Sequence, residues 1–540
     1  MKNIRIFSIF AAAAVLFACT SMDEIVPQSG SVLTSQLQET NVNIPSRANA
    51  AFLGMLTSIG QPDKIYTNHR RADDFGILML LLSSDLEGAD ALIADSGYNW
   101  FSVCGEYSSR NANYANPLLR YTYIYNEIAA ANDFIVSIPE DAPAESKYLV
   151  AQAHAIRAYA YMLAAPAFQF SYATAKDKPC VPLVTPDTPD FTHNPRASVE
   201  AIYNQIMDDL NYAVENLEGY KRTSKMNLDQ KVAYGLRARA NLAMENWEAA
   251  AADAEAAMEG FKPASIDDLS KPSFYSIKDG NWIWGYDMTT DVAKNNNYCT
   301  MDSWLRSFSG DGYAPACQCY VRINTLLYNK IPDTDVRKGW WVDEDLVSPL
   351  IEGLNWDNGE PVATAEVKDV KLAFLPYTNV KFGVDKIATI ANDNDFPLMR
   401  VEEMILIDAE ALAKGGDEAA GKKVLEDFVK TYRDPSYSAD ASGLAFADEV
   451  WLQRRIELWG EGFFTSDRSR LGKPLVRFHD NAKSTNFPDN FRFNMPADDP
   501  YLLMKFPQSE LNTNFDIVDN LGGSQPVIDQ NPSLKDGVTD

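Results

Sequence analysis

Two stretches of this sequence place aromatic side chains among amide, hydroxyl and carboxylate groups. The first is Tyr98, Asn99 and Trp100, which directly follow an Asp-Ser-Gly turn. The second is Trp304 and Tyr313, with serine, glycine and aspartate between them. A sugar ring presents an apolar face ringed by hydroxyl groups, so an aromatic face beside hydrogen-bonding side chains matches it. These five residues are therefore candidates for binding a glycan, or a peptide, which would use the same groups.

The sequence predicts no catalytic residue, no cofactor and no metal. It contains no H-E-x-x-H, no G-x-S-x-G and no dinucleotide-type glycine fingerprint. The run 416–423 is similar to a phosphate-binding loop, but it ends in lysine where a magnesium ligand is needed and lies between two predicted helices. The run 392–395 lacks the glycine and distal glutamate of a calcium loop and is better explained as a turn that caps a helix. With 75 acidic residues, composition alone cannot single out a glycosidase carboxylate pair.

Residues 262–397 form a region of different composition, rich in aromatic residues, Asn, Asp and Gly. Within it Trp282, Trp284 and Tyr286 alternate, so they would share one face of a short strand. A second strand is predicted at 362–374. Loop-rich regions of this kind carry function on a rigid scaffold, so Trp284 and Tyr286 join the candidate ligand-binding residues. The alternative is that these rings belong to the core, as rings of this size usually do.

Helical periodicity dominates most of the remaining chain. Apolar residues recur at spacings of three and four, Ser198 and Asp417 can cap helices, and Trp247 follows a tight turn and precedes a run of alanines. That last pattern resembles a tetratricopeptide repeat. We predict a mainly α fold in which tetratricopeptide-like helical pairs form a scaffold and the loop-rich insertion contains a few short strands. The predicted helices cover residues 120–166, 197–217, 232–244, 247–258, 398–414 and 417–432.

The stretch 446–470, FADEVWLQRRIELWGEGFFTSDRSR, reads as a buried helix that ends at a glycine pair. Its apolar residues fall on two faces, which indicates neighbours on both sides. Its charged residues must then be paired, and Arg454 and Glu457, three residues apart, share a face and could pair with each other. We interpret this stretch as a structural joint between the last helical pair and the C-terminal segment, not as a ligand site.

The N-terminus has the features of an export signal. Lys2 and Arg5 precede 13 apolar residues, a stretch too short to span a bilayer, and the end of the stretch at Cys19 resembles a bacterial lipobox. The resemblance implies cleavage before Cys19 and lipidation of that residue by several acyl chains, including palmitate, which together make a stable anchor. An ordinary secretory peptide is the alternative. Asp23 and Glu24 resemble the acidic signal that directs such lipoproteins to the cell surface.

The formal charge of −27 disfavours nucleic acid and anionic lipid as partners, since both require cationic patches. Five cysteines follow the lipobox, and an odd number cannot all pair within the chain. We expect most of them to be small buried residues. They are Cys104, Cys180, Cys299, Cys317 and Cys319.

Several motifs together resemble the SusD/RagB family. Within 446–470 the run R-R-x-E-L-x-x-E-G-x-x-x-x-D-x-x-R is similar to the signature near the C-terminus of that family, with Gln453, Phe464 and Arg468 departing from the usual residues. Residues 155–161 with 182–184, residues 400–411, and residues 507–514 with 530–532 resemble further family segments, and these matches span nearly all of the mature chain.

The resemblance implies a non-enzymatic lipoprotein of the outer membrane. It would capture glycan at the cell surface and deliver it to a SusC-like TonB-dependent transporter; alternatives are a peptide-binding uptake subunit of the RagB type or a surface glycosidase. It implies only a neighbourhood for the site, the loop at 98–100 and the aromatic insertion. The domain organisation we expect is a signal peptide at 1–18, a lipidated flexible tether at 19–45 and one domain at 46–540, with scaffold at 46–261 and 398–470, insertion at 262–397 and C-terminal segment at 471–540.

Overall fold

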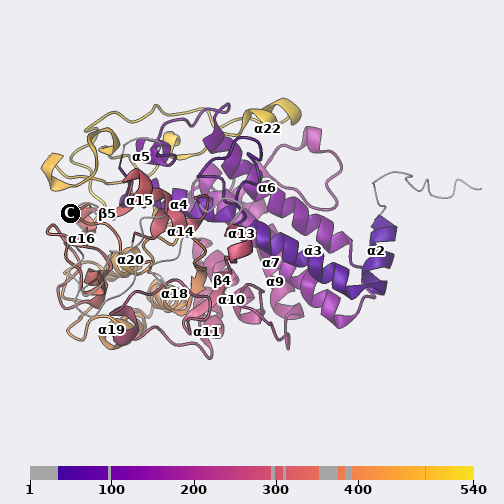
Figure 1. Cartoon of the computed structure of the whole chain (residues 1–540), viewed down its shortest axis with the longest axis horizontal. Coiled ribbons are helices and arrows are strands. Elements are labelled where there is room, and N and C mark those ends of the chain that lie inside the picture. The colour runs from indigo at the N-terminus through magenta and orange to yellow at the C-terminus, as the bar shows by residue number, and fades with distance from the viewer. Residues whose placement is uncertain are drawn as a thin grey trace, which may run out of the picture.

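A computed structural model describes residues 34–94, 99–293, 298–307, 312–351, 375–383, 392–480 and 482–540. The mainly α class that the sequence predicts is confirmed (Figure 1). The longer helices are α2 Thr34–Asn43, α3 Pro45–Ser58, α4 Ile77–Leu86, α6 Ala115–Val136, α7 Ala144–Phe168, α9 Val199–Asn216, α10 Gln230–Ala243, α11 Trp247–Met258, α18 Val401–Lys414, α19 Glu418–Tyr432 and α20 Phe446–Glu457. Shorter helices are α5 Ser102–Glu106, α8 Tyr172–Ala175, α12 Ile266–Leu269, α13 Thr290–Ala293, α14 Met301–Leu305, α15 Tyr313–Cys317, α16 Thr325–Tyr328, α21 Phe464–Arg470 and α22 Gln508–Thr513.

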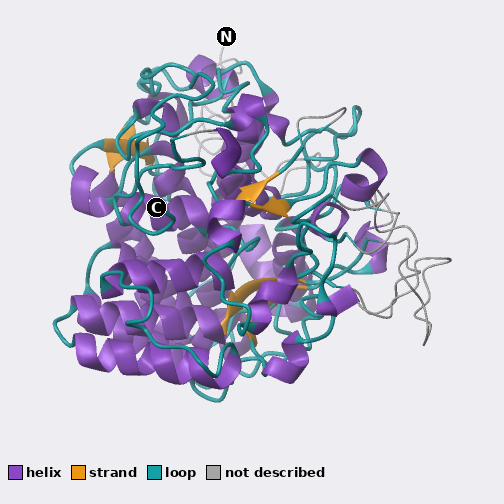
Figure 2. Cartoon of the chain, turned by 90° about the vertical axis from the view of Figure 1, so that its left-hand side faces the viewer, coloured by secondary structure: helices purple, strands orange, loops and turns teal. Residues whose placement is uncertain are grey.

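The helical pairs stack in the order of the chain. Helix α6 packs on α7, α7 on α9, α9 on α10 and α10 on α11. Helix α11 then packs directly against α18, although about a quarter of the chain lies between them, and α18 packs on α19 and α20. Figure 1 shows this stack running from α6 and α7 to α18 and α19, while the C-terminal segment crosses the opposite side through α22. Figure 2 shows loops gathered beside the stacked helices.

Local sequence explains where several of these helices begin. The Ser198 side chain accepts a hydrogen bond from the amide of Ala201 at the start of α9, and the Asp417 side chain accepts one from Ala420 at the start of α19. Both caps were predicted from sequence, because an N-cap depends only on residues within one turn. Alanines of α11 are buried against its neighbours and allow close approach of the helices.

The structure contains three two-stranded antiparallel sheets among the described residues. They pair β1 (Ala91–Leu92) with β5 (Arg322–Ile323), β2 (Pro179–Pro182) with β3 (Arg196–Ser198), and β4 (Trp282–Tyr286) with β6 (Phe396–Arg400). The β4–β6 sheet matters most for the fold because β4 belongs to the predicted insertion and β6 leads straight into α18. It fastens the insertion to the scaffold where the chain re-enters the helical stack.

Three sequence-based expectations are wrong in detail. The helix predicted over 120–166 is two helices, α6 and α7, which pack on each other. Residues 398–400 extend strand β6, and Pro397 lies in that strand, so the run 392–395 caps no helix. Helix α2 occupies part of the expected tether at 19–45, and its buried Asn41 donates to the carbonyl of Ser137 at 3.1 Å. The strand predicted at 362–374 lies outside the described residues.

Most of the core is one continuous hydrophobic cluster that joins the helical stack to the aromatic residues of 274–341. A satellite cluster lies under α18, α19 and α20, and a second joins Phe464 to the C-terminal segment through Leu475 and Phe493. In the part of the chain that the structure describes, no helix has the length and apolar character needed to cross a membrane.

Candidate functional site

Three of the aromatic residues that the sequence assigned to ligand binding lie in the core, which corrects that assignment. Trp284, Tyr286 and Trp304 have no exposed surface. The Trp284 indole donates to the carbonyl of Met226 at 3.1 Å, and the Tyr286 hydroxyl donates to the carbonyl of Thr57 at 2.8 Å. Each polar tip therefore has a backbone partner, as buried Trp and Tyr require. These residues attach the loop-rich region to the helices and offer no face to a ligand.

Trp100 and Tyr313 remain partly exposed, and the structure brings them together from stretches about 200 residues apart. The Tyr313 hydroxyl lies within hydrogen-bonding reach of the Trp100 side chain and of the Cys317 thiol. The Tyr313 ring lies over the buried Trp304, with ring centres 4.6 Å apart. Trp304 is fixed in turn by its indole, which donates to the carbonyl of Ala72 at 2.8 Å. A buried aromatic base thus supports an accessible aromatic surface.

Arg71 completes this surface and was missed by the sequence analysis. Its guanidinium lies 4.4 Å from the ring centre of Trp100 and 5.1 Å from that of Tyr66, in the range of cation–π contacts. Two of its nitrogens donate to Asp73 at 2.8 and 2.7 Å. We call Tyr66, Arg71, Trp100 and Tyr313 the aromatic platform. The charged run 70–74 before the apolar helix α4 is the signal that could have suggested Arg71; Tyr66 lies in the same loop, but Trp100 and Tyr313 come from other parts of the chain.

Asn99, which the sequence predicts to bind ligand, uses its side chain to hold the backbone of its own loop. Its side-chain amide donates to the carbonyl of Ala94, and its side-chain oxygen accepts from the amide of Phe101 at 3.1 Å. Both ends of this buried side chain are therefore engaged with the backbone on either side of residues 95–98. Tyr98, the remaining candidate of this loop, lies outside the described residues.

A cavity of about 250 Å³ adjoins the platform. Arg71, Asp73 and Trp100 line it together with residues at the start of α6, including Tyr114 and Asn116. The side-chain nitrogen of Asn116 is buried and has no hydrogen-bond partner among the described residues. An unpartnered donor of this kind costs free energy until a ligand or water satisfies it. The cavity therefore combines an aromatic wall with an available hydrogen-bond donor.

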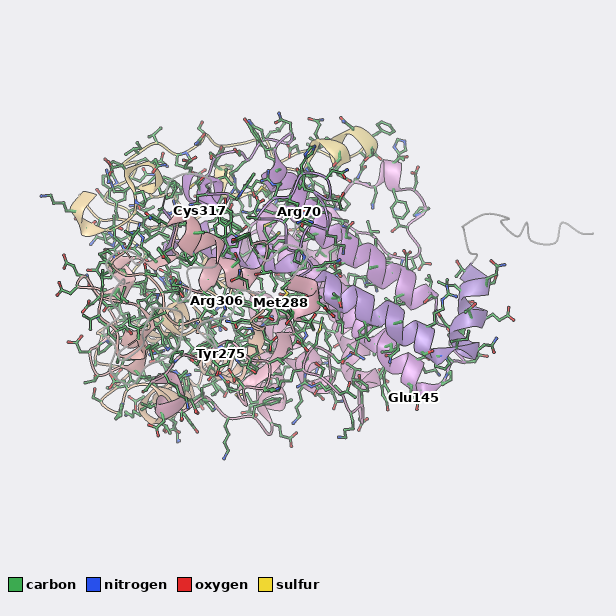
Figure 3. All side chains as sticks on the ribbon, viewed as in Figure 1. Arg70, Glu145, Tyr275, Met288, Arg306 and Cys317 are labelled. Carbon is green, nitrogen blue, oxygen red and sulfur yellow. The ribbon has the colours of Figure 1, made fainter. Side chains whose placement is uncertain are left out.

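Burial also affects the titratable groups of this site. It raises the pKa of the Asp73 carboxyl, although the hydrogen bonds from Arg71 oppose the shift. Burial raises the pKa of the Tyr313 phenol too, with the neighbouring Cys317 acting in the same direction. The phenol therefore stays protonated and able to donate at neutral pH. Figure 3 shows Cys317 in the upper part of the view, left of centre, and Glu145, in the first turn of α7, at the lower right.

Arg454 and Glu457 are buried and paired, as the sequence indicated, but each has other partners than the predicted one. Glu457 binds Arg433 at 2.7 Å, Arg400 at 3.0 Å and Arg337 at 3.3 Å, not Arg454. Arg454 instead binds Asp467 at 2.8 Å. The central ion cluster, defined here by its residues, consists of Asp335, Arg337, Lys381, Arg400, Glu402, Arg433, Glu457 and Glu461.

Helix α20 and the turn after it also join the two ends of the chain. Arg455 binds Asp90, just before β1, at 2.5 Å and Asp536, near the C-terminus, at 2.7 Å. The amide of Gly462 donates to Asp85 of α4 at 2.8 Å. Arg455 and its two carboxylate partners are only a few per cent exposed and lie on different elements, which explains why charged residues gather in this stretch.

Asp85 predicts a pH dependence of stability. Burial raises its pKa to about 7, although the amides of Gly462 and Phe464 lower it. Because the folded state binds a proton on Asp85 that the unfolded state releases near pH 4, this group makes stability fall as the pH rises from about 4 to 7, by about 1.4 kcal/mol for each pH unit. Urea unfolding across this range should therefore show a shallower decline for Asp85→Asn than for the wild type. Parallel curves for the two proteins would contradict the assignment.

The described residues contain no cluster of side chains suited to a metal ion and no disulfide. No group of three or more His, Cys, Asp or Glu side chains there is arranged to hold a metal ion. All five cysteines beyond the lipobox are free thiols, and Cys317 alone among them is not buried. Cys19, the predicted lipidation site, lies outside the described residues.

Two family models match the chain. The model described as "Starch-binding associating with outer membrane", named SusD-like, matches residues 82–242, and the model described as "SusD family" matches residues 361–532. Together these ranges cover more than half of the chain and include helices α6, α7, α9, α18, α19 and α20. None of the curated proteins matches the chain in sequence.

Several solved structures share the fold. A SusD-like carbohydrate-binding protein from Bacteroides vulgatus ATCC 8482 superposes with a TM-score of 0.69 at 23% identity, over 87% of this chain and 97% of that one. A SusD superfamily protein from Bacteroides thetaiotaomicron VPI-5482 gives a TM-score of 0.68 at 18% identity, over 88% and 99%. A laminarin-binding SusD-like protein gives a TM-score of 0.57 at 17% identity, over 88% and 99%.

Proposed function

Because the chain belongs to the SusD/RagB family, whose members are outer-membrane-associated binding proteins and not enzymes, we propose that it captures glycan and delivers it to a SusC-like TonB-dependent transporter. The observation that carries the proposal is the aromatic platform beside the 250 Å³ cavity. A sugar ring would lie with its apolar face on Trp100 or Tyr313, while Arg71 and Asn116 donate hydrogen bonds to its hydroxyl groups.

The neighbours support a carbohydrate more than a peptide. One matching family model is described as starch-binding, and two of the similar structures are named for carbohydrate or laminarin binding. The platform itself does not distinguish the two ligand classes, because peptides also use aromatic and amide groups. Isothermal titration of the purified protein against a panel of polysaccharides and peptides separates them. Binding to peptides alone would overturn the glycan proposal in favour of the RagB-like alternative.

Trp100→Ala is expected to weaken glycan binding about tenfold, since an aromatic face contributes up to about 1.5 kcal/mol beyond its burial. The fold should tolerate the change because Trp100 is only partly buried and contacts the core from its surface. Titration calorimetry and thermal unfolding measure both properties. Phe191→Ala is the matched control, because Phe191 is an aromatic residue 62% exposed outside the platform. A large fall in melting temperature for Trp100→Ala, or unchanged affinity, would contradict the assignment.

Membrane attachment through Cys19 is part of the same proposal. The basic residues Lys2 and Arg5, the apolar stretch and the lipobox-like end support it, as does the description of the family as associating with the outer membrane. Mass spectrometry of the mature protein from membranes should find Cys19 as the first residue, carrying acyl chains. Cys19→Ser should abolish the modification and release the protein from the membrane, and co-purification of a barrel transporter with the wild type would support the proposed partner. Unmodified Cys19 would overturn the anchor.

A further inference from the structure

A second cavity, of about 160 Å³, lies between helices α7 and α21 and shares no lining residue with the cavity at the aromatic platform. Its walls are mainly apolar. Tyr159, Met162 and Leu163 of α7 line it, with Ile407 of α18 and Phe463 just before α21. We call it the α7–α21 cavity. Met162, Leu163 and Phe463 are partly exposed, so these side chains border its access to solvent.

The α7–α21 cavity has an unusual balance of charge for this chain. Five arginines and four carboxylates line it, whereas the chain as a whole carries a formal charge of −27. These charges pair with one another, and Arg470 also binds Glu410 outside the lining, so what the cavity can offer an anion is a donor that these pairs leave over. The charged lining consists of Arg110, Arg120, Arg239, Arg454, Arg470, Glu87, Glu403, Glu461 and Asp467.

Arg454 lines this cavity and carries a buried donor. Its Nε and Nη2 atoms donate to Asp467 at 2.8 and 3.2 Å, which orients the guanidinium. Its Nη1 atom is buried and has no hydrogen-bond partner among the described residues, although Arg454 is only 3% exposed. A buried charged nitrogen without an acceptor is costly, and a carboxylate oxygen is the acceptor that offsets this cost best.

Phe463 defines where the apolar part of a ligand would lie. Its ring lies near the guanidinium groups of both Arg239 and Arg454, at 5.0 and 5.9 Å from the ring centre. Arg239 is already held by both oxygens of Glu403, at 2.7 and 2.6 Å, and by the carbonyl of Leu398, whereas the Nη1 atom of Arg454 is buried without a partner among the described residues. A cavity of roughly this size in a protein core accepts a benzene ring.

We propose that the α7–α21 cavity is a binding site for a small organic acid with an apolar body about the size of one aromatic ring. The carboxylate accepts hydrogen bonds from Arg454 Nη1, and the apolar body packs against Met162, Leu163 and Phe463. This site shares no lining residue with the cavity at the aromatic platform, so its test does not depend on whether glycan binds at the platform.

The test uses phenylacetate and its neutral analogue phenylacetamide, titrated into the full mature chain by calorimetry. Phenylacetate is expected to bind with one-to-one stoichiometry and a dissociation constant of about 1 mM or below, and the amide about tenfold more weakly, because it lacks the charge. Arg454→Lys, which keeps a cation for Asp467 but removes Nη1, is expected to weaken phenylacetate about tenfold. Absence of phenylacetate binding at millimolar concentration, or equal binding of acid and amide, overturns the proposal.

Leu163→Trp provides a variant that does not disturb the ion pairs. The larger side chain fills the cavity from its partly exposed border, so it should abolish phenylacetate binding while leaving the melting temperature nearly unchanged. Lys147→Trp, at an exposed position of the same helix, is the matched control and should bind phenylacetate as the wild type does. Undiminished binding by Leu163→Trp places the ligand elsewhere and overturns the site even if Arg454→Lys fails to fold.

Discussion

Glu457→Gln is expected to lower the free energy of unfolding by about 3–5 kcal/mol, the range found when one member of a buried ion pair is removed. Glu457 has no exposed surface and binds three arginines that are equally buried, Arg337, Arg400 and Arg433. Burial alone would raise its pKa, but these arginines hold it well below its ordinary range. Glutamine keeps the size of the side chain while removing the charge, so the guanidinium groups lose a shared counterion.

The measurement is the urea midpoint at neutral pH. Glu418→Gln is the control, because Glu418 is exposed and pairs with Lys422 at 3.2 Å within helix α19; pairs of this kind contribute about 0.3–0.5 kcal/mol. Equal midpoints for the two variants would show that the central ion cluster tolerates a neutral centre. The lowered pKa of Glu457 also predicts a pH dependence of stability. A carboxylate held below its ordinary pKa stabilises the fold above about pH 4, and this contribution is lost as the pH falls through the folded-state value.

Gly462→Ala is the second change for which we expect a large effect, a loss of about 2–5 kcal/mol. Gly462 has φ of +91°, a conformation that L-residues with a side chain rarely adopt. A Cβ atom there would also lie 2.8 Å from the Cα and 2.6 Å from the Cβ of Leu81, which is backbone-level contact with helix α4 that cannot be relieved by rotating a side chain. The displacement would pull the Gly462 amide away from Asp85.

Gly416→Ala separates the two causes. Gly416 has φ of +108°, but apart from its two chain neighbours no residue has an atom within 4 Å of the place its Cβ would occupy. It should therefore show only the backbone component, about 1–2 kcal/mol. Thermal unfolding of both variants decides the point. If Gly462→Ala lost no more stability than Gly416→Ala, the close approach of α4 would not be needed for the fold.

Features that depend on a few neighbouring residues could be predicted from the sequence. The helical periods, the caps at Ser198 and Asp417 and the break at the glycine pair are of this kind, and the structure confirms them. The partner of Arg454 could not be predicted, because a helix-internal neighbour and a residue beyond the turn offer the same charge. Sequence shows that a buried charge needs a partner, but it does not show which of many carboxylates lies beside that charge in the folded chain.

The candidate site also contains features that the sequence predicts and features that it does not. The composition of the insertion indicated accessible aromatic residues, yet Trp284, Tyr286 and Trp304 are buried because the loops fold back onto the helices and cover them. Trp100 and Tyr313 do lie together at the surface, and their role in ligand binding stays a prediction. The charged run around Arg71 is a local hint, but its stacking on Trp100, 29 residues later, depends on the path of the chain in space.

The contacts between α4 and the region after α20 bear on the order in which the chain can fold. During synthesis or export from the N-terminus, helices α6 to α11 can stack as they emerge, because each packs on its predecessor. Asp85 and Asp90 have no such early partner. Asp85 accepts hydrogen bonds from two backbone amides, and Asp90 from a guanidinium, of residues 455–464, which lie more than 360 positions later in the chain. A chain that stops before α20 would bury two carboxylates unsatisfied, which is unfavourable. Complete chains alone would then close around α4, and incomplete ones would leave it open to proteases.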